Sequence, residues 1–284
     1  MPLFPNLEEL HLNKVSVKPL QQTMVMASSV PSSSSSPSPL SRLKDMALYN
    51  IEDDGGSLPD GWASNLNSLK SLVICNYPRL TSMSGAMQYL TSLEKLKIMA
   101  WNGAEDDGME VETSQLPPYS VFLQTSKAGV SPCSCLKSLK KLRIVGFPNL
   151  TTFPEWISNF TSLEILEIEE CPNLTSLPDG MCYLRFLLHL RIQDCLNLTT
   201  FPERISELTS LQRLEIIKCP NLTSLPDGMH GLRSLQILEI IKCPNLTSTA
   251  RWDEWSQFFT RAGNCRLSPL LKWGRFFSRS IRMK

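Results

Sequence analysis

A repeat of fixed length constrains the fold of this chain more than any other feature of its sequence. The pattern L-x-x-L-x-I, followed in most units by a cysteine three residues later, begins at Leu139, Leu163, Leu187, Leu211 and Leu235, so each start lies 24 residues after the one before. A spacing kept over five units does not follow from composition alone, and it predicts one structural coil per unit. A single coil cannot bury its own apolar face, so the coils are expected to stack around a shared core.

Each unit is predicted to contain one short strand and one return segment. Side chains alternate along a strand, which points Leu166 and Ile168 inward and Glu167 and Glu169 outward. Pro and Gly after the strand, as in residues 178–180, are typical of turns and predict an irregular or helical return. The unit length falls in the range of roughly 20–29 residues that is typical of leucine-rich repeats.

The predicted fold is an α/β leucine-rich-repeat solenoid. Its curved parallel β-sheet forms the concave face, and short irregular or helical segments form the convex face. Four less regular units start at Leu7, Leu43, Leu69 and Leu93. Together with the five regular units they predict about nine repeats and nine strands.

The repeat pattern has two interruptions and an end. Residues 16–39 finish in a Ser/Pro tract, and residues 102–131 contain acidic and Pro-Pro sequences. Both are expected to be loops that extend from the solenoid without changing its register. The pattern fails after Leu246. We therefore expect residues 1–249 to be the leucine-rich-repeat domain and residues 250–284 to be a basic C-terminal tail.

Charge and composition indicate a protein of the cytoplasm. The net charge of +1 gives the chain as a whole no field that would steer it onto nucleic acid. The segment from Met1 to Leu12 lacks the apolar core of a secretory signal. The repeat places Cys171, Cys195 and Cys219 at equivalent positions, as expected for reduced thiols buried as small apolar groups.

The sequence offers no catalytic or metal-binding constellation, so we expect no enzyme activity, no cofactor and no metal. The three histidines, His11, His189 and His230, lie in no recognisable catalytic motif. Cys133 and Cys135 form a lone C-x-C, whereas a closed zinc site needs four ligands.

Six N-x-[ST] sequences have the form of glycosylation acceptors. Five of them share one repeat position, where the asparagine precedes a core leucine, so the repeat itself accounts for them and glycosylation is not expected. The six asparagines are Asn149, Asn159, Asn173, Asn197, Asn221 and Asn245.

The outward strand positions are the candidate protein-binding residues. They are Lys141, Arg143, Glu167, Glu169, His189, Arg191, Arg213, Glu215, Ile217, Ile237, Glu239 and Ile241. One column of outward side chains alternates in charge from Arg143 to Glu215, which predicts ion pairs between neighbouring strands. Exposed pairs of this kind contribute only ~0–1 kcal/mol each, so stability does not require them.

Three isoleucines of this set, Ile217, Ile237 and Ile241, are expected to form an exposed apolar cluster beside Lys218 and Lys242. An apolar patch with a polar rim is a candidate interface. Scattered apolar side chains on the surface of a sheet are the alternative interpretation.

A tail that is helical from about Leu270 would be a basic amphipathic helix. Such a helix suits an anionic membrane surface or a groove on a partner. A disordered extension, or a cap on the open end of the solenoid, is the alternative. The residues that would make the contacts are Lys272, Trp273, Arg275, Phe277 and Arg279.

The most regular units resemble the repeats of plant intracellular nucleotide-binding leucine-rich-repeat (NBS-LRR) disease resistance proteins of the coiled-coil class. The units from Cys171 to Met181 and from Cys219 to Met229 both read C-P-N-L-T-S-L-P-D-G-M. This resemblance implies a module of innate immunity that recognises pathogen effectors or guarded host proteins. It also implies that the module restrains a nucleotide-binding switch.

The sequence departs from this family in one respect. It contains no G-x-x-x-x-G-K-[ST] phosphate loop, so nucleotide binding cannot be carried over to this chain. The alternative to the immune function is a general intracellular leucine-rich-repeat scaffold or adaptor.

Overall fold

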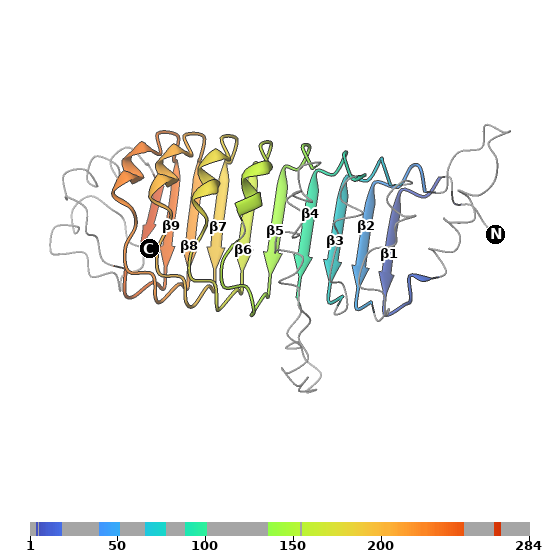
Figure 1. Ribbon diagram of the computed structural model, residues 1–284, viewed down its shortest axis with the longest axis horizontal. Coiled ribbons are helices and arrows are strands. Elements are labelled where there is room, and N and C mark those ends of the chain that lie inside the picture. The colour runs from blue at the N-terminus through green and yellow to red at the C-terminus, as the bar shows by residue number, and fades with distance from the viewer. Residues whose placement is uncertain are drawn as a thin grey trace, which may run out of the picture. The chain divides into compact units, whose positions relative to one another are not determined.

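The computed structural model describes residues 4, 6–18, 40–51, 66–77, 89–100, 136–153, 155–246 and 264–267 (Figure 1). The chain divides into two compact units, Met1–Lys141 and Leu142–Lys284. The predicted insertions fall mostly outside the described residues, because residues 19–39 and 102–131 are not among them.

The described residues of the first unit form four parallel strands in chain order. They are β1 (Glu9–Asn13), β2 (Asp45–Tyr49), β3 (Ser71–Cys75) and β4 (Lys95–Met99). Equivalent repeat positions lie opposite one another, since Leu48 aligns with Ile74, and Ile74 with Ile98. This register keeps the inward leucines and isoleucines on one face, where Leu48, Ile74 and Ile98 are buried.

The second unit repeats the same arrangement with greater regularity. Its strands, again parallel and in chain order, are β5 (Lys141–Val145), β6 (Ile165–Glu169), β7 (His189–Gln193), β8 (Arg213–Ile217) and β9 (Ile237–Ile241). β5 begins one residue before the boundary between the units. All nine predicted strands are therefore confirmed, and the prediction of a leucine-rich-repeat solenoid with a parallel sheet is correct.

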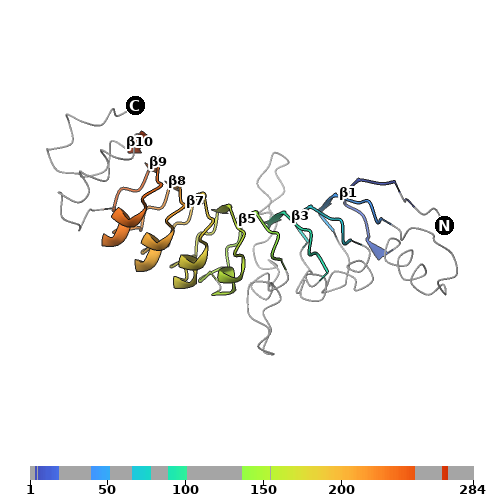
Figure 2. The same cartoon turned by 90° about the horizontal axis from the view of Figure 1, so that it is seen from above.

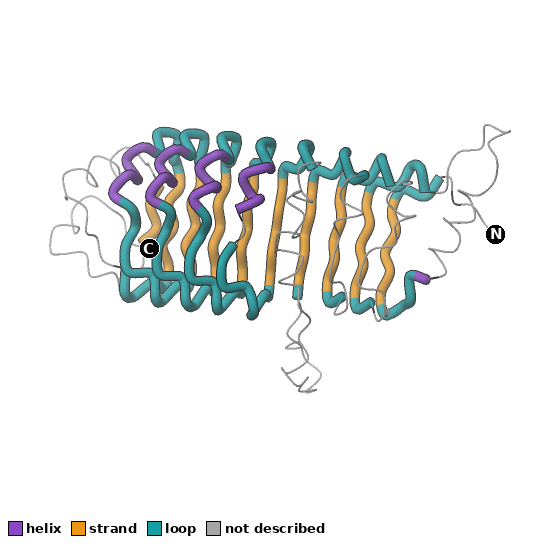
Figure 3. Tube along the Cα trace, in the orientation of Figure 1, coloured by secondary structure: helices purple, strands orange, loops and turns teal. Residues whose placement is uncertain are grey.

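Short 3-10 helices form the return segments of the second unit. They are η2 (Glu155–Asn159), η3 (Asp179–Tyr183), η4 (Glu203–Glu207) and η5 (Asp227–Gly231). They stack on one side of the strands, and each follows its strand after a loop (Figures 2 and 3). An extended proline precedes η3, η4 and η5, as at Pro178, where the fixed φ suits entry into the helical turn.

The core of the second unit is built from the same repeat positions in each coil. Leu166, Ile168 and Cys171 are completely buried, as are Leu190 and Ile192 in the next coil. Truncating such a side chain to alanine is expected to lower the free energy of unfolding by about 2–5 kcal/mol, because the neighbouring coils cannot collapse into the space.

A left-handed residue directly after each of the strands β5 to β9 makes the turn. Glu170, Asp194 and Lys218 have φ of 55°, 52° and 53°. Each of their N–H groups donates to the carbonyl at the end of the next strand, as from Asp194 to Ile217 at 2.9 Å. The left-handed conformation is unfavourable for these residues by roughly 1–2 kcal/mol, so it is held by the hydrogen bond between coils.

An asparagine ladder contains three of the six asparagines of the N-x-[ST] sequences, Asn173, Asn197 and Asn221. Asn197 Nδ2 donates to Asn173 Oδ1 at 3.1 Å, and Asn221 Nδ2 donates to Asn197 Oδ1 at 3.3 Å. Asn173 Nδ2 donates to the carbonyl of Pro148 at 2.7 Å. The asparagine at this repeat position therefore has a structural role, in which its amide links successive coils.

A further strand lies in the segment that the sequence pattern assigned to the tail. β10 (Asn264–Leu267) pairs in parallel with β9, with Asn264 opposite Ile237. The predicted helix residues of the tail lie outside the described residues. Within the described part of the chain, no helix is long and apolar enough to cross a membrane.

Candidate protein-binding face

All twelve predicted binding residues lie on strands β5 to β9. Their side chains leave the sheet opposite the buried leucines and isoleucines, and we call this surface the strand face. The predicted columns are confirmed where the register is described, since Glu167 lies opposite Arg191, Arg191 opposite Glu215, and Glu215 opposite Glu239.

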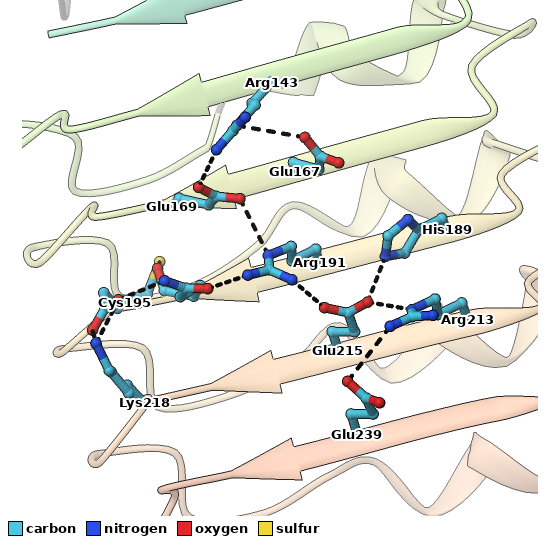
Figure 4. Close-up of polar contacts among 12 residues, drawn as sticks. Arg143, Glu167, Glu169, His189, Arg191, Cys195, Arg213, Glu215, Lys218 and Glu239 are labelled. Atoms are coloured by element: carbon cyan, nitrogen blue, oxygen red, sulfur yellow. Dashed lines mark hydrogen bonds and ion pairs between the residues drawn. The ribbon is translucent and has the colours of Figure 1, made fainter. Parts of the chain in front are cut away.

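Seven of these residues form one alternating series of ion pairs, which we call the ionic chain. It runs Glu167, Arg143, Glu169, Arg191, Glu215, Arg213, Glu239, and each arginine contacts the two glutamates beside it in the series (Figure 4).

Both ends of the ionic chain have defined geometry. Arg143 Nη2 lies 2.8 Å from Glu169 Oε2, and Arg143 Nε lies 3.5 Å from Glu167 Oε2. At the other end, Arg213 Nη2 lies 3.6 Å from Glu239 Oε2. The series therefore links the five consecutive strands β5 to β9.

Glu215 is the centre of the ionic chain. Its carboxylate accepts hydrogen bonds from Arg191 and Arg213 and lies 3.1 Å from His189 Nε2. Burial by itself raises the pKa of Glu215, but the hydrogen bond and charge of Arg213, with the charges of Arg191 and His189, outweigh it and hold the pKa below its usual range. The carboxylate is thus kept ionised in a buried position.

The prediction that these pairs are exposed was wrong for their glutamates. Only 2% of the Glu215 side chain is exposed, and 9% of Glu169. Removing one partner of a buried pair leaves a charge without compensation, which lowers stability by about 3–5 kcal/mol. The ionic chain therefore contributes to the stability of the fold as well as to its surface.

The sequence columns also gave only part of the pairing. A column consists of the side chains at one repeat position on neighbouring strands, and the prediction paired Arg191 with Glu215 in one column. The Arg191–Glu169, Arg213–Glu215 and His189–Glu215 contacts instead join different repeat positions. Diagonal neighbours in a sheet are within reach of long side chains such as arginine. This spacing is the signal in the sequence that would have found them.

The three isoleucines are less exposed than predicted. Ile217, Ile237 and Ile241 are half-buried, and Ile217 lies opposite Ile241. The backbone of β10 lies beside β9 and covers the edge of the strand that carries two of them. Beside this cluster, Lys218 Nζ pairs with Asp194 Oδ1 at 3.2 Å. The isoleucines add a small apolar area to a face that is otherwise charged.

The remaining candidates are placed as follows. Lys141 is the first residue of β5 and is half-buried, and His11 is exposed on β1. The side chain of His230 lies outside the described residues. Among the residues that the structure describes, no three His, Cys, Asp or Glu side chains are grouped so that they could hold a metal ion.

The repeated cysteines are free and buried. Cys171, Cys195, Cys219 and Cys243 form no disulfide, and the Cys171 thiol donates to the carbonyl of Glu169 at 3.4 Å. A hydrogen bond with Cys171, together with burial, raises the pKa of the Cys195 thiol. A thiol that stays protonated is a poor nucleophile, so Cys195 has a packing role.

The comparisons with known proteins agree with this geometry. Residues 122–257 match the family model described as a leucine-rich repeat region. The structure is similar to the leucine-rich repeat domain of the type III effector XopL, with a TM-score of 0.63 and 22% identity over 95% of this chain and 79% of that domain.

A second solved structure, TLR13 in its complex with ssRNA13, is similar with a TM-score of 0.54 and 15% identity. The similarity covers 94% of this chain and 33% of TLR13. No curated protein matches the chain in sequence. At these identities the solved structures show the fold alone, which is that of a leucine-rich-repeat solenoid.

Proposed function

We propose that this leucine-rich-repeat module binds a protein partner through the strand face of β5 to β9. The observation that carries the proposal is the ionic chain, in which arginine side chains are held in fixed positions above buried glutamates. Side chains that are already ordered lose little conformational entropy on binding, so they favour tight and specific recognition. Leucine-rich-repeat modules are typically protein-binding, which supports the same function.

We further propose that the partner belongs to plant innate immunity, as a pathogen effector, a guarded host protein or a nucleotide-binding switch domain. The support is the repeat sequence itself, since the units from Cys171 and Cys219 read as those of NBS-LRR disease resistance proteins do. The free buried cysteines fit a reducing compartment, so we also propose a cytoplasmic location.

The experiment is capture of partners from infected plant tissue by the immobilised chain and two matched double variants. Ile237→Glu with Ile241→Glu places two charges on the strand face. Tyr183→Glu with Phe186→Glu places two charges outside the strands, on η3 and on the turn that follows it, where Tyr183 and Phe186 are exposed.

We expect the strand-face variant to lose partners that the unmodified chain and the other variant retain, and circular dichroism to show that both variants are folded. Equal capture by both variants would contradict the assignment of the face. Capture of proteins unrelated to defence would favour the general scaffold.

A further inference from the structure

We infer that the partner segment received by the strand face is an acidic peptide. This inference rests on the proposed function, because it names the chemistry of the partner at the same face. The net formal charge of the ionic chain does not by itself favour an acidic ligand, since the chain holds three arginines and four glutamates. The inference comes from the depth at which the two kinds of charge lie.

The two kinds of charge lie in two layers. The arginine side chains keep about a third of their surface exposed, with 34% for Arg143, 31% for Arg191 and 38% for Arg213. The glutamates beneath them range from 2% for Glu215 to 13% for Glu239. Each pair is therefore a dipole with its positive end toward solvent, and a partner meets guanidinium groups first.

The arginines have donors to offer. A guanidinium carries five N–H donors in a planar fork, and this fork matches a carboxylate in bidentate geometry. The described contacts of Arg143 use Nε and Nη2, and those of Arg213 use the same two atoms. The contacts of Arg191 use Nε, Nη1 and Nη2. The donors that an incoming carboxylate meets are therefore those of Arg143 on β5 and Arg213 on β8, whose positions the buried glutamates fix.

A peptide fits this face better than a nucleic acid. Nucleic acid binding depends on the neutralisation of many phosphates, whereas the ionic chain offers three arginines, which suit a few carboxylates. The half-buried Ile217, Ile237 and Ile241 also lie at one end of the arginine row, where they suit apolar side chains between acidic ones. The favoured ligand is thus a peptide of acidic and aliphatic residues.

The test measures fluorescence anisotropy of a short labelled peptide of glutamate and leucine, with a lysine-for-glutamate counterpart and a single-stranded oligonucleotide as competing probes. We expect the glutamate peptide to bind, the lysine peptide not to bind, and affinity to fall with rising salt. A preference for the lysine peptide would overturn the inference, and so would a preference for the oligonucleotide.

Two variants of one ion pair make the test specific. Arg143→Gln removes an exposed positive charge and is expected to weaken binding of the glutamate peptide about threefold to fivefold. Glu167→Gln removes one negative charge beneath it, while Glu169 still holds Nη2, and is expected to strengthen binding by a similar factor. Damage to the fold would weaken binding in both variants, so changes of opposite sign separate recognition from misfolding.

Arg204→Gln is the matched control. Arg204 is also an arginine bound to a glutamate, Glu207, but it lies on η4, on the side of the 3-10 helices. We expect no change in affinity from this variant. An effect as large as that of Arg143→Gln would show binding by general charge and overturn the inference. The capture experiment tests the proposed function separately, because it does not depend on the sign of the partner's charge.

Discussion

Replacing Glu215 with glutamine tests whether the buried ionic chain stabilises the fold. The Glu215 side chain is 2% exposed and contacts Arg191, Arg213 and His189, so the neutral amide leaves two guanidinium groups short of a counter-charge. Breaking a buried pair in this way lowers stability by about 3–5 kcal/mol. Because both arginines are about a third exposed and can regain water, we expect a loss near the lower end, about 3 kcal/mol.

The assay is urea denaturation followed by circular dichroism. With a slope of about 2–3 kcal/mol per molar urea, the expected loss moves the midpoint down by about 1–1.5 M. The control is Glu207→Gln, which breaks the pair with Arg204 on an exposed surface, where side chains are 44% and 50% exposed, and is expected to change stability by less than about 1 kcal/mol. Equal effects of the two variants would refute the reasoning that burial gives the ionic chain its energy.

Three further predictions concern pH, packing and thiol reactivity. The pKa of Glu215 is lower in the folded chain than the value of about 4.3 expected in the unfolded chain. The stabilisation from this carboxylate is therefore present above that pH and is lost as the pH falls through the folded pKa. Denaturation measured at several pH values should show that the Glu215→Gln variant lacks this part of the acid dependence. Gly231→Ala should lower the melting temperature more than Gly228→Ala, because its added Cβ would lie 2.8 Å from Ser206 Cβ and 2.9 Å from the Ser206 carbonyl, against 3.1 Å for the nearest atom at Gly228; the reverse order would count against the packing of η4 on η5. The buried Cys195 thiol should react with Ellman's reagent only after unfolding, and rapid labelling of the native chain at this residue would contradict its burial.

The fold could be predicted from the sequence because its information is local and repeated. The spacing of Leu163, Leu187 and Leu211 sets the length of the coil, and the alternation around Leu166 and Ile168 sets the strand and its inward face. A register error of one residue would turn every core side chain outward, so the pattern admits one alignment of neighbouring coils. The strands, their order and their pairing follow from these facts.

The strand β10 could not be predicted in this way. Residues 264–267 read N-C-R-L, so Cys265 and Leu267 keep the apolar alternation opposite Leu238 and Ile240, but the strand starts outside the 24-residue spacing. Its pairing with β9 uses backbone groups, which an unpaired edge strand offers to any extended segment. An alternation of four residues is too short to identify a strand once the spacing is lost.

The candidate face was predicted in its residues but not in its energetics. The sequence placed Glu169, Arg191 and Glu215 on outward positions, and the structure confirms these positions. An outward position on a strand does not imply exposure. Here long arginine side chains fold over the shorter glutamates and exclude water from them. Burial on the outside of a sheet depends on how neighbouring side chains lie, and this is a property of the assembled coils.

The most direct test of the central claim is photo-crosslinking from single positions on the folded chain. A photoreactive amino acid in place of His189 would lie on the strand face, and one in place of Phe186 would lie at the exposed turn just before the same strand. With a captured partner present, we predict a covalent adduct from the His189 position and none from the Phe186 position. An adduct from Phe186 alone would contradict the claim that this module binds its partner through the strand face.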